Sequence, residues 1–202
     1  MNDQPEVPEH ARRPLVDLLD DVAAEVPAPG GGASAAWTTA LAAGLVDMAA
    51  RFTLARGEHA AVHGRMREVS ARAAELRARA LELAERELHA YEPVLEALKL
   101  PREDPSRPER MESALSAAAG PPLEIAGAAA EVSELAAEMV AGGSRLLEGD
   151  AVAGLLLAEA ACRAAARLVR INLGGREGDP RLDELTSLVE RVSAARSSAP
   201  SA

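Results

Sequence analysis

Aromatic residues are almost missing from this 202-residue chain, which has one tryptophan, one tyrosine and one phenylalanine. A core without aromatic rings must be built from alanine, leucine and valine, and each alanine buries little area. Such folds gain stability from long helices and from a second subunit. The length suits one domain with a sizeable core, so we expect a single helical domain over residues 1–202, with disordered ends at about 1–12 and 197–202.

Cys162 is the only cysteine, which excludes a disulfide within the chain. This use of cysteine fits a reducing compartment. The segment Met1–Pro14 is polar and contains prolines, so it lacks the apolar core of a signal peptide. We therefore expect the protein to be cytoplasmic.

Positive charge is also scarce, with 22 lysines and arginines against 32 acidic residues and a net charge of -10 at pH 7. Nucleic-acid binding requires a concentrated basic surface, and anionic membranes attract basic segments. The stretch Ala33–Ala50 is long and low in charge, but it is rich in alanine and contains two threonines and Asp47. A transmembrane span is more apolar than this, so we expect neither nucleic acid nor a membrane as a partner.

The period-two alternation typical of strands is missing as well, and every segment with a clear pattern predicts a helix. Pro93 should kink the longest helix, because it removes a backbone hydrogen bond. The predicted fold is all-α: an up-and-down bundle of long alanine-rich helices with a Gly-rich turn. The expected helices cover residues 14–25, 33–54, 58–98, 111–119, 121–141, 151–173 and 180–195.

The Gly-rich turn is the most informative segment of the chain. Gly30–Gly32 follow Pro27–Pro29 and lead directly into the alanine-rich helix. The prolines stiffen the approach, and the glycines allow positive φ angles and close backbone contact. The free N–H groups at the start of the next helix favour an anion or a carbonyl oxygen, so we expect part of a binding site here.

One carboxylate interrupts the apolar stripe of the long helix. The stripe has four-and-three spacing through Leu83, and the same spacing places Glu87 and then Tyr91 at inward positions. Burial without a partner would raise the pKa of Glu87, as is common for general acid–base catalysts. Periodicity alone favours the alternatives, which are a salt bridge to a neighbouring helix or a stripe that reaches the surface near Pro93.

Other polar residues leave a choice between a structural and a functional role. Asp150 precedes an alanine-rich helix, where an aspartate is most often an N-cap. Asp47 is the sole charge in its helix before Arg51, which predicts either an ion pair or a place in a site. Arg170 and Asn172 lie near a helix end, where two polar groups could face a cleft.

The histidines do not form a convincing metal site. His59 and His63 are one turn apart, as two metal ligands would be, but no third ligand has suitable spacing. The glycine run lacks the Lys-Ser/Thr ending of a P-loop, and no nucleophile–histidine pattern can be placed. We therefore expect no metal ion.

Six segments together resemble the cyclodeaminase/cyclohydrolase family, which includes the cyclodeaminase domain of formiminotransferase-cyclodeaminase and a bacterial methenyltetrahydrofolate cyclohydrolase. They occur in the family's order and with similar spacing over about residues 15–188. The resemblance implies an all-helical homodimer that acts on one-carbon units held between N5 and N10 of tetrahydrofolate. The six segments are Pro29–Gly32, Phe52–Thr53, Ala90–Pro101, Pro122–Ala126, Gly149–Ala153 and Arg170–Leu173.

The resemblance also assigns catalytic roles. The family's catalytic aspartate matches Glu87, and the aspartate of its Ser-Asp pair matches Asp150, so we expect both to be catalytic. The chain departs from the family at these places, because Glu87 replaces an aspartate, and Ala33 and Gly149 stand where the family has serines. These departures weaken the expectation of activity more than the expectation of the fold.

The substrate implied by the resemblance is a small-molecule folate. Arg56 is the one residue that keeps the basic character of its segment, and Arg170 would complement the acidic glutamate tail of folate. Neither cyclodeamination nor cyclohydrolysis needs a metal or redox cofactor, so none is implied. A non-catalytic folate-binding protein and a helical dimeric scaffold are the alternatives. The residues expected to bind substrate are Gly30, Gly31, Gly32, Ser34, Arg56, Glu124, Arg170 and Asn172.

Overall fold

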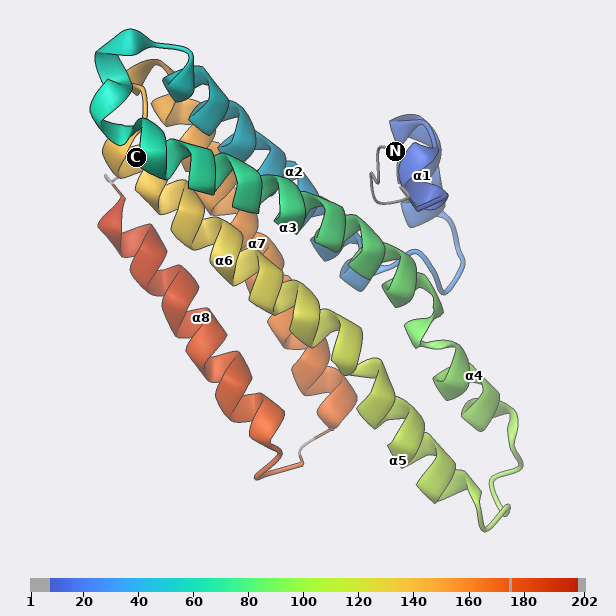
Figure 1. Ribbon diagram of the computed structural model, residues 1–202. Coiled ribbons are helices and arrows are strands. Elements are labelled where there is room, and N and C mark those ends of the chain that lie inside the picture. The colour runs from blue at the N-terminus through green and yellow to red at the C-terminus, as the bar shows by residue number, and fades with distance from the viewer. Residues whose placement is uncertain (1–7, 175, 200–202) are drawn as a thin grey trace, which may run out of the picture.

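A computed structural model describes residues 8–174 and 176–199, and every regular element in these two ranges is a helix (Figure 1). The all-α prediction is therefore confirmed. Three short 3₁₀ segments also occur, at His10–Arg12, Gly57–Val62 and Arg145–Leu147. The α-helices are α1 (Leu15–Ala23), α2 (Gly31–Leu54), α3 (His63–Ala90), α4 (Glu92–Lys99), α5 (Arg107–Ala118), α6 (Gly120–Gly142), α7 (Glu148–Leu173) and α8 (Pro180–Ser198).

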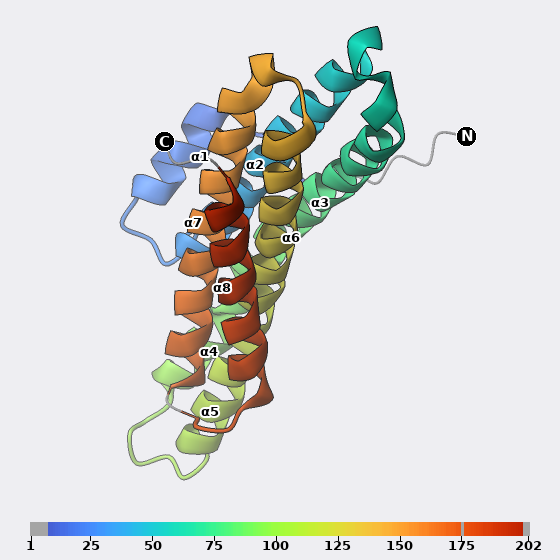
Figure 2. The ribbon, with the colours of Figure 1, turned by 90° about the vertical axis from the view of Figure 1, so that its left-hand side faces the viewer.

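Four long helices, α2, α3, α6 and α7, run side by side and enclose the core, and α8 packs against α6 and α7 (Figures 1 and 2). Helix α2 packs against α3 and α7, and α6 packs against α7. Small side chains allow this close approach, because alanines such as Ala36, Ala43 and Ala129 are fully buried at the helix contacts. Larger apolar residues, including Val46 and Leu155, fill the remaining space.

The expected long helix over residues 58–98 is divided into three pieces. Gly57–Val62 form a 3₁₀ segment, α3 ends at Ala90, and α4 begins at Glu92. Pro93 is in the first turn of α4, where a missing N–H costs nothing. Pro93 therefore starts a new helix instead of kinking a continuous one. Helices α4 and α5 extend beyond the bundle at one end (Figure 1).

The boundaries of α7 correct one expectation and confirm another. Helix α7 begins at Glu148, so Asp150 is inside its first turn and is not the N-cap. An acidic side chain there still interacts favourably with the helix dipole. The helix ends at Leu173 as expected, and Gly174 adopts a left-handed conformation with φ of 56°.

The two ends of the chain lie partly outside the described residues. Residues 1–7 and 200–202 are outside them, whereas residues 10–12 form a 3₁₀ turn and residues 197–198 belong to α8. His10 contacts Glu85 of α3, with 3.0 Å between Nδ1 and Oε2. This contact holds the start of the described chain against the bundle.

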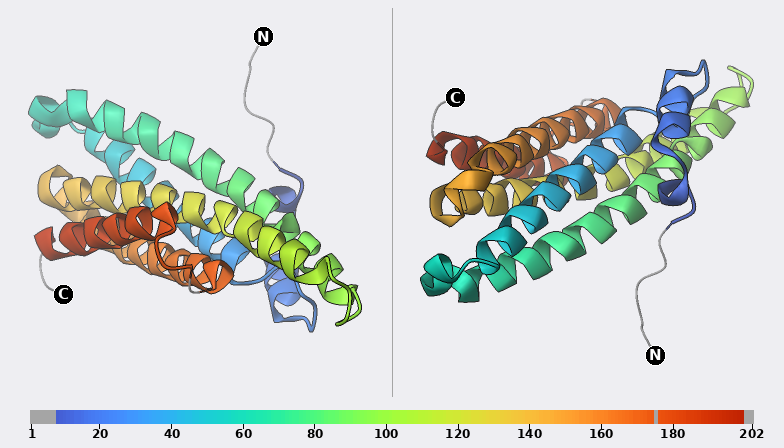
Figure 3. Two further views of the ribbon diagram at one scale, coloured as in Figure 1. Left: turned by 90° about the horizontal axis from the view of Figure 1, so that it is seen from below. Right: turned by 90° about the horizontal axis from the view of Figure 1, so that it is seen from above.

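Helix α1 stands apart from the bundle (Figures 1 and 3). None of its residues is buried, and Leu15, Val16 and Leu19 of its apolar face are 70%, 60% and 59% exposed. Within the described part of the chain, no other element covers the apolar face of α1. Among the described helices, none is both long and apolar enough to cross a membrane.

Candidate functional site

Glu87 lies in the last turn of α3 and packs directly on the first turn of α2. The contact depends on Gly32, because a Cβ atom built there would be 1.9 Å from Glu87 Oε1 and 2.5 Å from its Cγ. Any side chain at position 32 would displace the carboxyl group. The Gly-rich turn and the interrupting carboxylate, two separate features of the sequence, thus meet at one point.

The Glu87 carboxyl is poorly compensated. Its Oε2 atom is buried and has no hydrogen-bond partner among the described residues. The neighbouring Arg86 pairs with Glu124 of α6, with 2.7 Å between NH2 and Oε1. Burial therefore raises the pKa of Glu87 from its ordinary value of 4.5 to about 7. The salt bridge considered from periodicity does not form in the described structure.

A cavity of about 470 Å³ opens beside this carboxyl; we call it the Glu87 cavity. The Gly-rich turn forms one side, the junction of α3 and α4 a second, and the last turns of α7 a third. Its lining is mainly apolar, with Glu87 and Asn172 among the polar groups. The lining residues are Pro27, Ala28, Gly30, Gly31, Gly32, Glu87, Leu88, Tyr91, Glu92, Leu95, Leu168, Ile171 and Asn172.

The glycines act here through close approach and not through positive φ. Gly30 is the N-cap of α2 with φ of -121°, and none of Gly30–Gly32 has a positive φ. The first N–H groups of α2 have no carbonyl partner within the helix, so they are available at the edge of the cavity. The Ser34 hydroxyl donates to the Gly30 carbonyl over 2.9 Å and thereby fixes the start of the helix.

The other expected binding residues at this end of the bundle have different positions. Asn172 lines the cavity and donates from Nδ2 to the Ala118 carbonyl over 2.8 Å. Arg170 is exposed and does not line the cavity. Glu124 is also outside the cavity. Arg86 and Arg79 donate hydrogen bonds to its carboxylate and lower its pKa. The structure thus brings Asn172 to Glu87 but leaves Arg170 and Glu124 outside.

Asp150 and Arg56 lie at the opposite end of the bundle. The start of α7 adjoins the end of α2 there, and the Ser144 N–H donates to Thr53 Oγ1 over 3.1 Å. Asp150 precedes Leu168 of the Glu87 cavity by 18 residues, or about 27 Å at 1.5 Å per residue. Within one chain, therefore, neither Asp150 nor Arg56 reaches Glu87.

Asp47 is buried and has polar partners. Its side chain is 6% exposed, and the Ser70 hydroxyl donates to Oδ1 over 2.6 Å. Arg51 Nε is 3.5 Å from Oδ1, and Arg77 NH1 is 3.9 Å from Oδ2. The ion pair considered for Asp47 is found, and Asp47 also lines a cavity of about 500 Å³ together with Arg51, Arg56 and Arg77.

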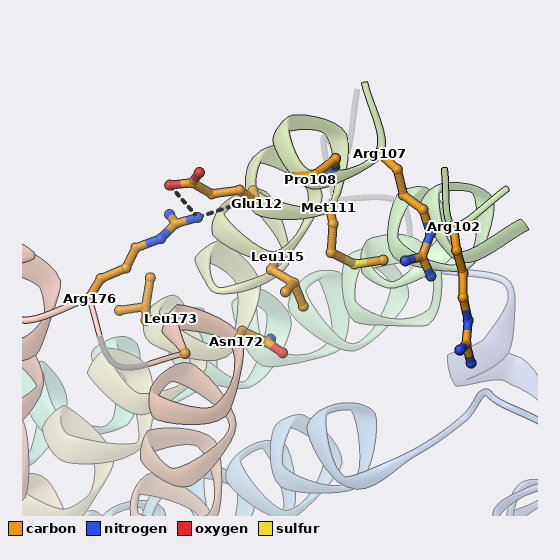
Figure 4. Close-up of a pocket in the computed structure, with 10 residues that line it drawn as sticks. Arg102, Arg107, Pro108, Met111, Glu112, Leu115, Asn172, Leu173 and Arg176 are labelled. Atoms are coloured by element: carbon orange, nitrogen blue, oxygen red, sulfur yellow. Dashed lines mark hydrogen bonds and ion pairs between the residues drawn. The ribbon is translucent and has the colours of Figure 1, made fainter. Parts of the chain in front are cut away.

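A second cavity, of about 480 Å³, shares Asn172 with the Glu87 cavity, and Figure 4 shows the residues that line this second cavity. We call it the α5 cavity. Sequence reasoning missed its arginines, Arg102 and Arg107, because they lie in a proline-rich segment without periodicity. Their only signal was two cations close together among prolines. Within the described ranges, no three His, Cys, Asp or Glu side chains lie together as a metal site.

Comparison with known proteins gives three findings. A sequence profile of the formiminotransferase-cyclodeaminase family matches residues 14–190. The chain is 29% identical over 185 residues to a methenyltetrahydrofolate cyclohydrolase of Methylorubrum extorquens, covering 88% of this chain and 89% of that protein. The fold is similar to the crystal structure of formiminotetrahydrofolate cyclodeaminase from Thermotoga maritima, with a TM-score of 0.85, 24% identity, and coverage of 94% and 95% of the two chains.

Proposed function

The chain belongs to the formiminotransferase-cyclodeaminase family, and on this premise we propose that it hydrolyses the one-carbon bridge of 5,10-methenyltetrahydrofolate. The observation that carries the proposal is the Glu87 carboxyl, which faces a cavity with its pKa raised to about 7. Such a group exchanges protons readily at neutral pH. The name of the Methylorubrum extorquens relative, which aligns over most of both chains, supports hydrolysis as the reaction.

The reaction requires one group that both accepts and returns a proton. Water adds to the carbon between N5 and N10, and the Glu87 carboxylate accepts the proton that the water loses. The C–N5 bond of the neutral adduct then breaks as Glu87 returns that proton to N5. The hydroxyl of the adduct becomes the carbonyl of a formyl group on N10, and its proton leaves to solvent. The first N–H groups of α2 and Asn172 would orient the polar edges of the substrate.

Cyclodeamination of 5-formiminotetrahydrofolate is the second candidate. In that reaction N10 attacks the formimino carbon, and ammonia leaves after it has gained a proton. A pKa of about 7 favours this candidate too, because a large fraction of Glu87 is protonated at neutral pH. The same carboxyl then acts as the acid instead of the base.

We further propose that the protein is a homodimer. Large apolar side chains on the outer face of α2, those of Leu41, Met48 and Phe52, are exposed, as is the apolar face of α1. A second copy would cover such surfaces. The separation of Asp150 from Glu87 supports the same arrangement, because a two-fold contact in which the α2 helices run antiparallel would bring opposite ends of two chains together. Asp150 and Arg56 would then contribute to the site across the interface.

The function is tested by absorbance with purified protein and two parallel substrates. Loss of the methenyl chromophore faster than the buffer rate supports cyclohydrolysis, and its appearance with ammonia release supports cyclodeamination. If neither rate exceeds background, the enzyme proposal is wrong. Folate binding without turnover would then indicate a binding protein, and absence of binding would indicate a scaffold.

Mixed subunits test the shared site. Chains with Glu87→Gln and chains with Asp150→Asn are each expected to be inactive. If Asp150 acts across a two-fold interface, an equal mixture that exchanges subunits should regain about a quarter of the sites, because half of the dimers are mixed and each of these has one intact site. A mixture that exchanges subunits and stays inactive would remove Asp150 from the partner's site.

A further inference from the structure

We propose that the α5 cavity binds the carboxylates of the glutamate tail of the folate substrate, with Arg102 and Arg107 as the recognising residues. This inference rests on the proposed function, because it assumes that the reacting part of a folate occupies the Glu87 cavity. It replaces Arg170, which sequence reasoning assigned to the same tail, with two arginines of the segment that leads into α5.

The shape of the α5 cavity suits a chain with an apolar stem and charged ends. Met111 and Leu115 of α5 and Leu173 of α7 form apolar parts of its wall. Arg102 and Arg107 lie on one side of it and the Arg176–Glu112 pair on the other (Figure 4). Its volume of about 480 Å³ is within the range of small-molecule sites.

The charges of the two arginines are uncompensated within the described residues. Neither side chain forms a hydrogen bond or ion pair there, and the Nε of Arg107 is buried without a partner. Other arginines of the chain are paired: Arg65 and Arg72 of α3 are each held by two glutamates. In a chain with a net charge of -10, two neighbouring unpaired arginines at a cavity favour an external carboxylate.

The remaining charges at the cavity do not cancel this preference. Glu112 also lines it, but the Arg176 guanidinium is 3.3 Å from its Oε1 and donates to the Glu112 carbonyl over 2.7 Å. Asp104, close to both arginines in sequence, instead accepts hydrogen bonds from the N–H and hydroxyl of Ser106. Glu112 and Asp104 thus have other partners, and no ion pair joins Arg102 or Arg107 to an acid of the described residues.

The two cavities are neighbours, in an order that suits a folate. Asn172 lines both of them, and its bond to Ala118 fixes the wall where they meet. In a folate the p-aminobenzoyl group separates the reacting N10 from the glutamate. A folate with its one-carbon unit at Glu87 and its benzoyl group at Asn172 therefore places its carboxylates in the α5 cavity.

The test compares methenyltetrahydrofolate with methenyltetrahydropteroate, which has the same reacting centre but no glutamate. We expect wild type to have a KM at least tenfold lower for the folate, since charge-assisted bidentate contacts are lost with the tail. In Arg102→Gln/Arg107→Gln this ratio should fall below twofold, mainly through KM. The control is Arg110→Gln, which removes an exposed arginine of α5 that does not line the cavity and should leave the ratio unchanged.

The outcomes separate the two proposals. Equal KM values for both substrates in wild type, or an equal effect of Arg110→Gln, would overturn the tail site while turnover upholds the proposed function. If wild type turns over neither substrate, calorimetry with p-aminobenzoylglutamate tests the tail site by itself. Binding that the double variant loses supports the site without the function, and absence of binding rejects it. A free anion site is identified if inorganic phosphate competes as well as p-aminobenzoylglutamate does.

Discussion

Two carboxyl side chains, the half-buried Glu87 at one end of the bundle and the buried Asp47 toward the other, have opposite surroundings. Asp47 accepts a hydrogen bond from Ser70 and has two arginines within 4.0 Å. Glu87 has an unpartnered Oε2 atom, apolar neighbours and a glycine against its side chain. The Asp47 carboxyl lies beside two arginines, whereas burial raises the pKa of Glu87 to about 7.

The difference shows that burial alone does not identify a functional acid. A buried carboxylate that is fully paired helps to hold one conformation, and its partners favour the charged form over proton uptake. A buried carboxyl that faces a cavity without a partner is a cost to folding, which is a reason to expect that function maintains it. Arginine contacts distinguish the two sites. Arg51 and Arg77 pair with Asp47, whereas Arg86, next to Glu87 in sequence, pairs with Glu124 instead.

The largest expected effect comes from Glu87→Gln, which keeps the shape of the side chain and removes its proton exchange. We expect kcat to fall by roughly 10²–10⁴-fold, the usual contribution of a general acid or base. Circular dichroism should still show a helical protein. Turnover within threefold of wild type would show that Glu87 is not in the mechanism and that it does not differ in function from Asp47.

Gly32→Ala should have the second largest effect. The new Cβ would occupy the place of the Glu87 carboxyl, so the side chain must move, and we expect turnover to fall about 100-fold, as misplacement by about 1 Å does. Gly127→Ala in α6 is the matched control, because nothing lies within 4 Å of a Cβ there. That variant should be fully active and more stable by about 0.5–1 kcal/mol. Equal activities of the two variants would contradict the role of close approach.

The pH dependence should reflect the pKa of Glu87 at about 7. If the carboxylate is the base, kcat rises with pH and levels off above about 7; if the acid form acts, kcat falls there. Because the folded pKa is raised, the contribution of Glu87 to the free energy of unfolding should decrease from pH 4.5 to about 7 and then stay constant. Glu87→Gln should lose both dependences, as measured by rate profiles and urea denaturation. An inflection that persists in the variant would assign it to another group.

Asp47→Asn should have the smallest effect on activity, and it should lower the stability of the fold. Its ion pairs with Arg51 and Arg77 are weakened while the Ser70 hydrogen bond can persist. We expect a loss of about 1 kcal/mol in unfolding free energy and turnover within threefold of wild type. Urea denaturation and the absorbance assay measure the two quantities. A 100-fold loss of turnover would place Asp47 in the site and break the comparison.

The periodicity of the chain predicted the helices, and its interruption at Glu87 singled out the carboxyl that the structure places beside a cavity, although periodicity alone favoured a salt bridge or a surface position. Such patterns are local, since each depends on spacing within one helix. The expectation for α1 depended on the same kind of pattern, yet the structure leaves its apolar face uncovered within the described chain. Periodicity shows that a face is apolar but does not say what covers it.

The sequence by itself determined the all-helical fold, the glycine turn and the carboxylate that interrupts an apolar stripe, because these follow from residue spacing along single helices. Only the tertiary structure decided which of these features meet. It packed Glu87 on Gly32, kept Arg170 and Glu124 outside the cavity, and placed Asp150 and Arg56 at the far end. The physical reason is that a bundle of helices about 35 Å long separates or joins residues according to how the helices are packed, and not according to their motifs.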